Sequence, residues 1–134
     1  MNDAVRKLLD DPNPAILATV NPDGSPQTSV VWVCRDGDDL LLSSAAGRRK
    51  ERNLQRDPRV SLTVYDPRDP QLYVEVRGTA TVEEDEGRAL AVRLDESYEG
   101  PGAGQKFLDL PPEVVRVVIR ITPHHLAGTA TATA

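Results

Sequence analysis

Six short segments of the chain carry the residue pattern of β-strands, and tight turns join most of them. They cover residues 15–20, 26–34, 39–44, 60–65, 72–82 and 115–121. In the clearest, Val60, Leu62 and Val64 alternate with more polar residues, as expected for a strand with one buried face. Turn residues follow the first strand in Asn21-Pro22-Asp23-Gly24. Because few helices lie between the strands, the sequence predicts an antiparallel rather than a parallel sheet.

Curvature and three short helices complete the expected fold. Gly78 interrupts the strand 72–82, and a glycine there is typical of a bulge or bend that curves a sheet. The spacing of Val5, Leu8 and Leu9 predicts a helix that ends before Pro12. Two more helices are expected over residues 47–56 and from the acidic run 83–86 to residue 94. The predicted fold class is therefore mainly β, a small six-stranded antiparallel barrel with short helices.

The length of the chain suits one domain. With 134 residues, we expect a single unit over residues 1–134. The tail 128–134 alternates Thr and Ala and has too little apolar surface to order itself without an edge or a partner to pair with, so it is expected to be flexible. The N-terminus lacks the profile of a signal peptide, and no stretch approaches the length of a membrane span. We therefore expect a cytoplasmic protein without a membrane partner.

A basic segment follows the third predicted strand. Residues 48–56 carry a net charge of +4, whereas the whole chain carries −5. Its basic residues are Arg48, Arg49, Lys50, Arg52 and Arg56. A basic helix start preceded by Ser43 and Ser44 can bind a phosphate, because backbone amides, hydroxyls and guanidinium groups all favour an anion. A solvated helix face would have the same composition, but Leu54 alone anchors this helix, so packing does not explain its charge.

Several functional classes fit the sequence poorly. An acidic chain lacks the broad basic surface of a nucleic-acid-binding protein. The single cysteine, Cys34, lies in an apolar run and is predicted to be a buried structural thiol. The two histidines, His124 and His125, are adjacent and would point to opposite faces of a strand, so neither a metal pair nor a Ser-His-Asp set is expected. The acidic run Glu83–Glu86 is more typical of a helix start than of a metal site. With no catalytic side chain and no metal indicated, an organic cofactor would supply the chemistry.

The size of the barrel limits where such a cofactor can bind. Side chains fill the interior of a barrel this small, so the cofactor would lie on the outside. A flat ring on the outside stays half exposed unless a second subunit covers it. We therefore expect a homodimer with the site at its interface.

Five fragments of the chain carry a further signal. They are Ile16-Leu17-Ala18-Thr19-Val20, Gln27-Thr28-Ser29-Val30-Val31-Trp32, Gly47-Arg48-Arg49-Lys50 with Arg52-Asn53-Leu54, Asp57-Pro58-Arg59-Val60, and Val76-Arg77-Gly78-Thr79-Ala80. In this order they resemble the pyridoxamine 5′-phosphate oxidase-like split β-barrel family, and more closely its actinobacterial branch that uses the deazaflavin coenzyme F420. The resemblance implies a homodimeric six-stranded split β-barrel that binds flavin or deazaflavin in a groove between two subunits.

The same resemblance implies which residues contact the cofactor. Arg48 and Lys50 would hold the phosphate, with Arg49 as a third cation and Ser43 or Ser44 donating hydroxyl groups. The ring system would lie along the second strand. Its contacts would be Gln27, Thr28, Ser29, the backbone through Val31, and Trp32 at its flank.

Four other residues would have supporting roles by this resemblance. Asn53 would support the start of the basic helix, and Arg77 would line the groove wall. Tyr98 and Lys106, near the glycine-rich loop 98–105, would reach the site of the partner subunit. We expect the loop itself to be mobile, as in a lid.

The resemblance also implies the activity. The protein would be an F420-dependent oxidoreductase that transfers a hydride from reduced deazaflavin to an unsaturated small-molecule acceptor. FMN is the alternative cofactor, and a flavin- or deazaflavin-binding protein without a reaction is the alternative class. The acidic oligoglutamate tail of F420 favours further positive charge, which Arg52 and Arg56 would supply. The chain is short for the true pyridoxamine phosphate oxidase and lacks its substrate-phosphate residues, so oxidation of vitamin B6 is not expected.

Overall fold

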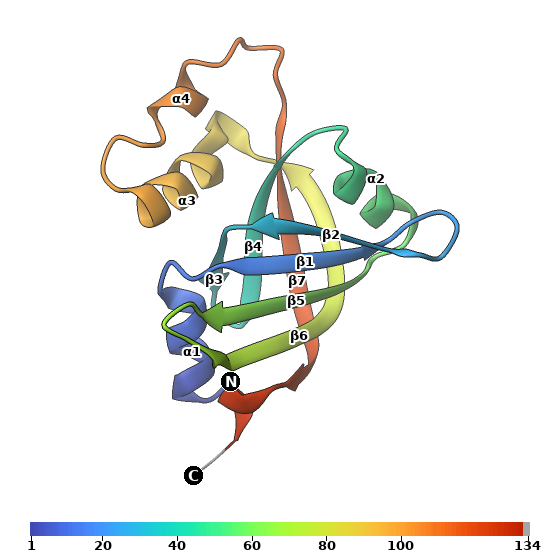
Figure 1. Cartoon of the computed structure of the whole chain (residues 1–134). Helices are drawn as coiled ribbons and strands as arrows, with labels where there is room; N and C mark the ends of the chain where they lie inside the picture. The colour runs from blue at the N-terminus through green and yellow to red at the C-terminus, as the bar shows by residue number, and fades with distance from the viewer. Residues whose placement is uncertain (133–134) are drawn as a thin grey trace.

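One antiparallel sheet of seven strands, curled on itself, forms the centre of the computed structural model, which describes residues 1–132 (Figure 1). The strands are β1 (Ala15–Val20), β2 (Pro26–Val31), β3 (Val33–Asp36), β4 (Asp39–Ala45), β5 (Arg59–Asp66), β6 (Asp69–Glu84) and β7 (Arg116–Ala127). Their order across the sheet is β2-β1-β5-β6-β7-β4-β3, and every neighbouring pair is antiparallel. The predicted mainly β, antiparallel barrel architecture is confirmed.

The strand predicted over residues 26–34 is two strands in the structure. The pairing partner changes at Trp32: Val31 of β2 lies opposite Ala15 of β1, whereas Val33 of β3 lies opposite Leu42 of β4. β2 and β3 are therefore the two edges of the sheet although a single residue separates them in the chain. This connection joins the two edges of the curled sheet in the chain and raises the number of strands from the expected six to seven.

A bulge bends the longest strand, β6, where the sequence places Gly78. Arg77 lies opposite His125 but Gly78 lies opposite Pro123, so the register shifts between them. A Cβ atom on Gly78 would lie 2.2 Å from the carbonyl oxygen of Thr122, far inside contact distance. Only glycine allows this close approach of two backbones, and the predicted bulge is confirmed.

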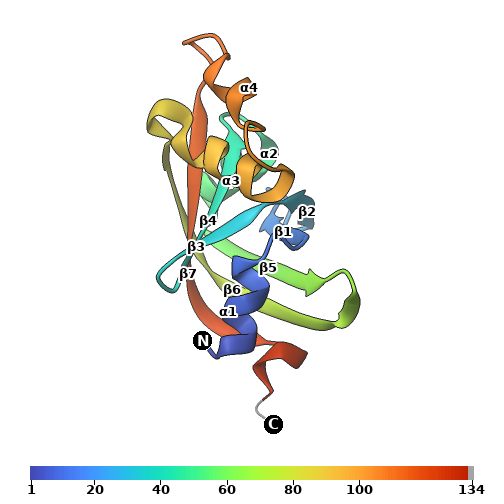
Figure 2. The same ribbon diagram turned by 90° about the vertical axis from the view of Figure 1, so that its left-hand side faces the viewer.

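Short helices lie at the two ends of the barrel. They are α1 (Asp3–Asp10), α2 (Arg49–Arg56), α3 (Ala89–Glu99) and α4 (Gln105–Leu108), with the 3-10 turns η1 (Glu86–Arg88) and η2 (Thr129–Thr131). Figure 2 shows α2, α3 and α4 at one end and α1 with both termini at the other. The three expected helices are present, and the ordered turn α4 is a fourth.

The acidic run 83–86 does not begin α3, which corrects the sequence-based expectation. Glu83 and Glu84 end β6. The Asp85 carboxylate accepts hydrogen bonds of 3.0 Å from the amides of Leu90 and Ala91, and α3 begins at Ala89. The run therefore serves the helix through Asp85 alone, whose carboxylate satisfies two amides that the first turn leaves free.

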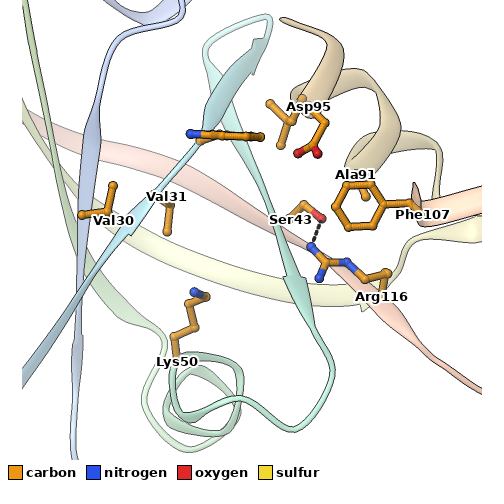
Figure 3. Close-up of a pocket in the computed structure, with 10 residues that line it drawn as sticks. Val30, Val31, Ser43, Lys50, Ala91, Asp95, Phe107 and Arg116 are labelled. Atoms are coloured by element: carbon orange, nitrogen blue, oxygen red, sulfur yellow. Dashed lines mark hydrogen bonds between the residues drawn. The ribbon is translucent and has the colours of Figure 1, made fainter. Parts of the chain in front are cut away.

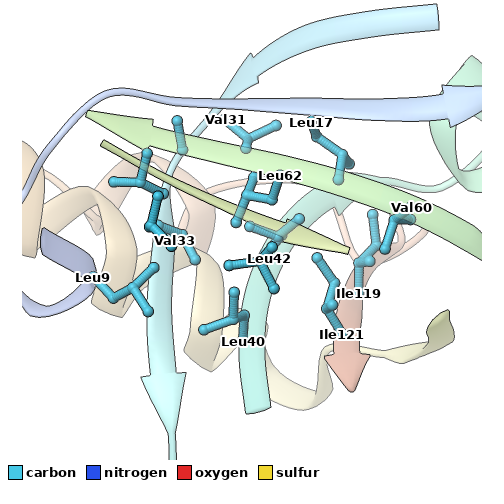
Figure 4. Packing of buried hydrophobic residues seen from close by; sticks show 14 of the residues in the cluster. Leu9, Leu17, Val31, Val33, Leu40, Leu42, Val60, Leu62, Ile119 and Ile121 are labelled. Carbon is cyan, nitrogen blue, oxygen red and sulfur yellow. The ribbon is translucent and has the colours of Figure 1, made fainter. Parts of the chain in front are cut away.

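Aliphatic side chains fill the interior of the curled sheet (Figure 4). The largest fully buried ones are Leu9, Leu17, Leu40, Leu42, Leu62, Ile119 and Ile121. A second apolar cluster joins the outer face of β4 to α3 through Leu41, Leu90 and Leu94. Cys34 is half-buried beside this cluster, and burial raises the pKa of its thiol, which fits a structural role. The second cluster attaches α3 beside the β2–β3 connection, where the candidate site lies.

The chain beyond β7 packs against β6. Thr129 Oγ1 accepts a hydrogen bond of 3.1 Å from the amide of Tyr73, and Ala130 is buried. Contact with the start of β6 thus orders residues 128–132, a part of the tail expected to be flexible, while 133 and 134 lie outside the described residues. Within residues 1–132 no helix combines the length and the apolar character that crossing a membrane requires.

Candidate functional site

A pocket of about 160 Å³ opens on the outside of the curled sheet, beside the connection between β2 and β3 (Figure 3). Residues from β2, β4, β7, α2, α3 and α4 converge on it. We call it the Lys50 pocket. Its lining residues are Val30, Val31, Trp32, Ser43, Lys50, Ala91, Leu94, Asp95, Phe107 and Arg116.

Lys50 brings the positive charge of α2 into this pocket. Helix α2 begins where the carboxylate of Glu51 accepts a hydrogen bond of 3.1 Å from the amide of Gly47. Lys50 is half-buried, and burial, with the nearby charges of Arg48 and Arg116, lowers the pKa of its ammonium group. Among residues 1–132, no carboxylate lies within 4.0 Å of its Nζ. A partly desolvated cation without an acidic partner favours the binding of an anion.

Ser43 and Arg116 form the wall facing Lys50. Arg116 Nη2 donates a hydrogen bond of 2.8 Å to Ser43 Oγ, and its Cζ lies 4.8 Å from the centre of the Phe107 ring. Burial lowers the pKa of Arg116, but a guanidinium stays charged in any case. Arg116 Nε is buried and has no hydrogen-bond partner in the described part of the chain. A donor of this kind is available to a ligand.

The one carboxylate in the pocket wall already has a cation beside it. Asp95 is buried on α3, and its Oδ2 lies 2.7 Å from Nζ of Lys106. The hydrogen bond with Asp95 raises the pKa of Lys106. The negative charge of Asp95 acts on Lys106 of α4 and on Arg116.

Trp32 is held from behind by Tyr98. The two rings stack with centroids 4.9 Å apart and planes 9° from parallel. The Tyr98 hydroxyl donates a hydrogen bond of 2.8 Å to the carbonyl of Asn13 and accepts one of 3.2 Å from the amide of Val33. Trp32 therefore has a defined position in the pocket wall, because its neighbour is fixed at both ends.

Four residues selected from the sequence line the Lys50 pocket, namely Val31, Trp32, Ser43 and Lys50. Arg48 is exposed at the N-cap of α2, close enough for its charge to act on Lys50. The choice between Ser43 and Ser44 is decided by strand alternation. Ser44 is buried on the other face of β4, where its hydroxyl donates a hydrogen bond of 3.2 Å to the carbonyl of Ala45.

The selected residues of β2 lie beside the pocket rather than in its wall. Gln27 accepts a hydrogen bond of 2.9 Å from Thr19 Oγ1, and Thr28 is exposed. The Ser29 hydroxyl is buried and makes no hydrogen bond to any of residues 1–132. These three polar residues therefore form the part of β2 that leads up to Val30 and Val31 in the pocket wall.

Three other selected residues lie away from the pocket. Arg49 is exposed and lines a shallow depression with residues 21–23. Asn53 is fully buried, and its amide donates hydrogen bonds of 3.0 Å to Thr19 and Asn21, so it fixes α2 against β1 and has no surface for a ligand. Arg77 is exposed and pairs with Glu75 at 2.6 Å.

The residues around the glycine-rich loop make contacts within the chain, and their expected reach to a partner subunit stays a prediction. Tyr98 contacts Trp32 and Lys106 contacts Asp95, both within the same chain. Gly104 packs so closely on α3 that a Cβ atom would lie 2.6 Å from Val92 Cγ1. In this structure the loop attaches α4 to the pocket wall.

Sequence reasoning missed Val30, Ala91, Leu94, Asp95, Phe107 and Arg116 in the pocket wall. A weak signal existed for Arg116, since it precedes the buried residue Val117 in an alternating strand and must face outward. Only the pairing of β4 with β7 brings it beside Ser43. Within residues 1–132, no three His, Cys, Asp or Glu side chains come together in a way that could hold a metal.

Comparison with known proteins agrees with this fold. The family described as pyridoxamine 5′-phosphate oxidase matches residues 1–130. A pyridoxine/pyridoxamine 5′-phosphate oxidase of Rubrobacter xylanophilus is 34% identical over 107 residues, which cover 78% of this chain and 49% of that protein. This chain therefore matches about half the length of that relative.

Among solved structures, an F420 reductase is 32% identical with a TM-score of 0.79, and the match covers 95% of this chain and 98% of that one. A conserved hypothetical protein of Mycobacterium tuberculosis is 26% identical with a TM-score of 0.71, over 94% and 82% of the two chains. A protein of unknown function from Agrobacterium tumefaciens, 20% identical with a TM-score of 0.74, shares the fold over 97% of this chain and 56% of its own. The family match over nearly the whole sequence shows that this chain belongs to the pyridoxamine 5′-phosphate oxidase family.

Proposed function

We propose that this protein is an F420-dependent oxidoreductase that transfers a hydride from reduced deazaflavin to an unsaturated small-molecule acceptor. It belongs to a family of oxidoreductases, and an F420 reductase is 32% identical to it over nearly the full chain. The observation that carries the proposal is the Lys50 pocket. There Lys50 and Arg116 are both half-buried, a serine hydroxyl lies beside Arg116, and neither cation has an ion-pair partner among the described residues.

The donors of this pocket fit the phosphate of a flavin or deazaflavin cofactor. Lys50 offers an ammonium group, and Arg116 offers a buried Nε without a partner. A phosphate between them would offset the repulsion that the two cations exert on each other, and charge-assisted hydrogen bonds are the strong ones. Ser43 and the exposed Arg48 would add further donors.

The pocket does not enclose a whole cofactor. Its volume of about 160 Å³ lies below the about 300 Å³ at which pockets for drug-sized ligands begin. The ring system would therefore extend past Trp32 along β2, where Thr28 and Val30 are exposed. Such a ring would lie open to water on one side.

A second copy of the chain would cover that side, and we therefore include a homodimer in the proposal. Ile16 of β1 and Val30 of β2 lie opposite each other and are 38% and 72% exposed. Exposed aliphatic side chains next to one another are typical of an interface. Because Val30 also lines the Lys50 pocket, a subunit packed on it would complete the pocket wall.

In this proposal the chain supplies orientation rather than a covalent catalyst. When bound, reduced F420 supplies the hydride. Lys50, Arg116 and Ser43 fix the phosphate, while Trp32, backed by Tyr98, gives the ring a rigid neighbour. Ala91 and Leu94 keep water from that side of the pocket. Holding donor and acceptor in one geometry removes much of the entropic barrier to their reaction.

Arg52 is the better of the two residues expected to meet the oligoglutamate tail. Arg56 is occupied, since it donates hydrogen bonds to the Val20 carbonyl and to Asn53 Oδ1. Arg52 is exposed on the same helix, and within residues 1–132 its side chain takes part in no ion pair. A deazaflavin with its tail would thus gain more from α2 than FMN does.

Titration with F420 and, separately, with FMN tests the proposal. Trp32 is the only tryptophan and lines the pocket, so quenching of its fluorescence reports binding there. Tight binding of F420 with weak binding of FMN is the expected result, and the reverse would assign the protein to flavin chemistry. Binding of neither would leave α2 as a solvated basic helix.

Turnover separates an enzyme from a protein that only binds the cofactor. Bound reduced cofactor is expected to be oxidised by a quinone, an enone or a tetrapyrrole faster than free cofactor is. No acceleration with any of the three would favour the binding protein.

A further inference from the structure

We propose that Arg88 is a positioning residue of the Lys50 pocket, which acts by fixing α4 so that Phe107 holds the Arg116 guanidinium toward a bound anion. The proposal rests on the proposed function in that the anion is the cofactor phosphate. Arg88 does not line the pocket. Its effect would pass through two other side chains, and each link is a contact in the structure.

The first link joins Arg88 to the chain between α4 and β7. Its Nη1 donates hydrogen bonds to the carbonyls of Phe107 at 3.1 Å and Leu110 at 3.0 Å, and its Nη2 donates to those of Pro111 and Val114. A single guanidinium thus ties down backbone from residue 107 to residue 114. A shorter or more compact cation cannot reach four carbonyls that lie so far apart along the chain.

The backbone at Arg88 is unusual in a way that supports this role. Its φ of 56° makes it the only residue other than glycine with positive φ among residues 1–132. The left-handed region is unfavourable for a residue with a side chain, because its Cβ comes too close to the following carbonyl oxygen, so the surroundings must hold it there. The four carbonyl contacts supply that restraint and define where the side chain points.

Helix α4 depends on such polar contacts because it has little apolar attachment. It is four residues long, and Leu108 is 52% exposed. Its remaining anchors are the ion pair between Lys106 and Asp95 and the close packing of Gly104 on Val92. Removing Arg88 therefore frees the end of α4 that carries Phe107.

The second link joins Phe107 to Arg116, as Figure 3 shows together with the hydrogen bond to Ser43. Arg116 also lines a neighbouring cleft of about 510 Å³ that contains Glu84, Asp85 and Glu86. Asp85 and Asp95 attract the guanidinium, whereas the cation Arg48 repels it. The ring of Phe107, 4.8 Å from Arg116 Cζ, adds a cation–π contact that stabilises the guanidinium beside Ser43.

The test compares Arg88→Asn with Arg93→Asn. Asparagine tolerates the left-handed backbone but cannot reach the four carbonyls, so Arg88→Asn removes the contacts without adding strain. Arg93 is an exposed residue of α3, the helix that Arg88 precedes, and its replacement changes the charge equally. We expect Arg88→Asn alone to speed hydrogen exchange of amides 105–114 while exchange in β5 and β6 stays slow.

Affinity is measured in the same variants with F420, FMN and inorganic pyrophosphate, followed by Trp32 fluorescence. We expect Arg88→Asn to weaken binding about tenfold or more, the scale of a misplaced charge-assisted hydrogen bond, and Arg93→Asn to leave it unchanged. Arg88→Lys should not rescue binding, because an ammonium group cannot span the carbonyls. Faster hydrogen exchange of amides 105–114 with unchanged affinity would overturn the proposal. So would an exchange rate that does not change in Arg88→Asn.

A double-mutant cycle with Phe107→Leu separates positioning from a general loss of order. If Arg88 acts through the ring, Arg88→Asn costs little further affinity once Phe107 is replaced, whereas independent effects add. Additive losses would therefore count against the proposal.

The readouts also distinguish this proposal from the proposed function. A wild-type protein that binds neither F420 nor FMN ends the proposed function, and the comparison then rests on pyrophosphate. A wild-type protein that does not bind pyrophosphate either would end the present proposal too.

Discussion

Arg116 Nη2 donates a hydrogen bond of 2.8 Å to Ser43 Oγ across a sequence separation of 73 residues. The bond exists because β4 and β7 are neighbours in the sheet, with Ala45 opposite Arg116. It places a half-buried guanidinium beside the strand that leads into the basic helix α2. The candidate site thus combines a local feature, the basic helix, with a cation that the topology supplies.

Replacing Lys50 tests the centre of the site. Lys50→Met should weaken F420 binding by about 2 kcal/mol, roughly thirtyfold, since a charge-assisted hydrogen bond to phosphate is lost. Adding Arg48→Ala should weaken it further while the thermal unfolding midpoint stays close to that of the wild type. The double variant Arg49→Ala/Arg68→Ala, with the same change of charge at exposed positions outside the pocket, is the control. Equal losses in both double variants would mean that only the overall charge of the protein matters.

The lowered pKa of Lys50 predicts how anion binding depends on pH. Burial, with the charges of Arg48 and Arg116, makes Lys50 lose its proton below the ordinary lysine value of about 10.4. Affinity for an anion should therefore fall as pH rises through this lowered pKa, by up to about tenfold per pH unit. Dissociation constants between pH 7 and pH 10 measure the effect. In Lys50→Arg the decline should disappear, and a decline that persists there would assign it to another group.

The same shift predicts the opposite trend for the stability of the ligand-free protein. The folded state disfavours the protonated form of Lys50, so this residue lowers stability while pH is below its folded pKa. That cost diminishes as pH rises from the folded pKa toward the unfolded one, because the unfolded chain then binds more protons. The free energies of unfolding of the wild type and of Lys50→Met, measured in urea across this range, should differ most at the lower pH.

Val30 tests the proposed homodimer. Val30→Lys should leave the fold intact, because the side chain is 72% exposed, but it should shift the protein to the monomer in sedimentation experiments. Thr81→Lys on the exposed face of β6 is the matched control and should not change the mass. A wild-type protein that is already monomeric would contradict the proposal directly.

Gly78 tests the bulge that bends β6. Gly78→Ala should destabilise the protein by about 2–4 kcal/mol, because a Cβ atom would lie 2.2 Å from the backbone oxygen of Thr122 and two strands would have to separate. Gly37→Ala is the comparison, since Gly37 has a φ of 62° but open space around it, and about 1 kcal/mol is expected there. Urea unfolding measures both, and similar losses would show that the close approach is not what requires glycine at position 78.

Local patterns were enough to predict most of the elements. Alternation located the strands, and the residues around Pro12 and Gly78 marked the end of α1 and the bulge. The break at Trp32 was not predictable, because the residues on either side look like one strand and differ only in the partner each pairs with. The start of α3 was placed too early, because acidic residues suit both a strand end and a helix start.

The candidate site divides in the same way. The basic helix with Lys50 and the hydroxyl of Ser43 could be selected from sequence, since residue type and spacing carry that information. Asn53 was expected to support the start of this helix, and in the structure its amide is buried against Thr19 of β1, a contact that depends on the fold. Asp95, Phe107 and Arg116 could not be selected, because nothing near them in the chain distinguishes them from surface residues.

The sequence by itself determined that this protein is an antiparallel barrel with a basic helix, because hydrophobic periodicity, turn residues and local charge act over a few neighbouring residues. The tertiary structure alone decided that the pocket has a second cation, an aromatic residue over it and an arginine that ties down α4. These features arise from strand pairing and helix packing between residues far apart in the chain, where the energy of a contact depends on geometry that no local pattern encodes.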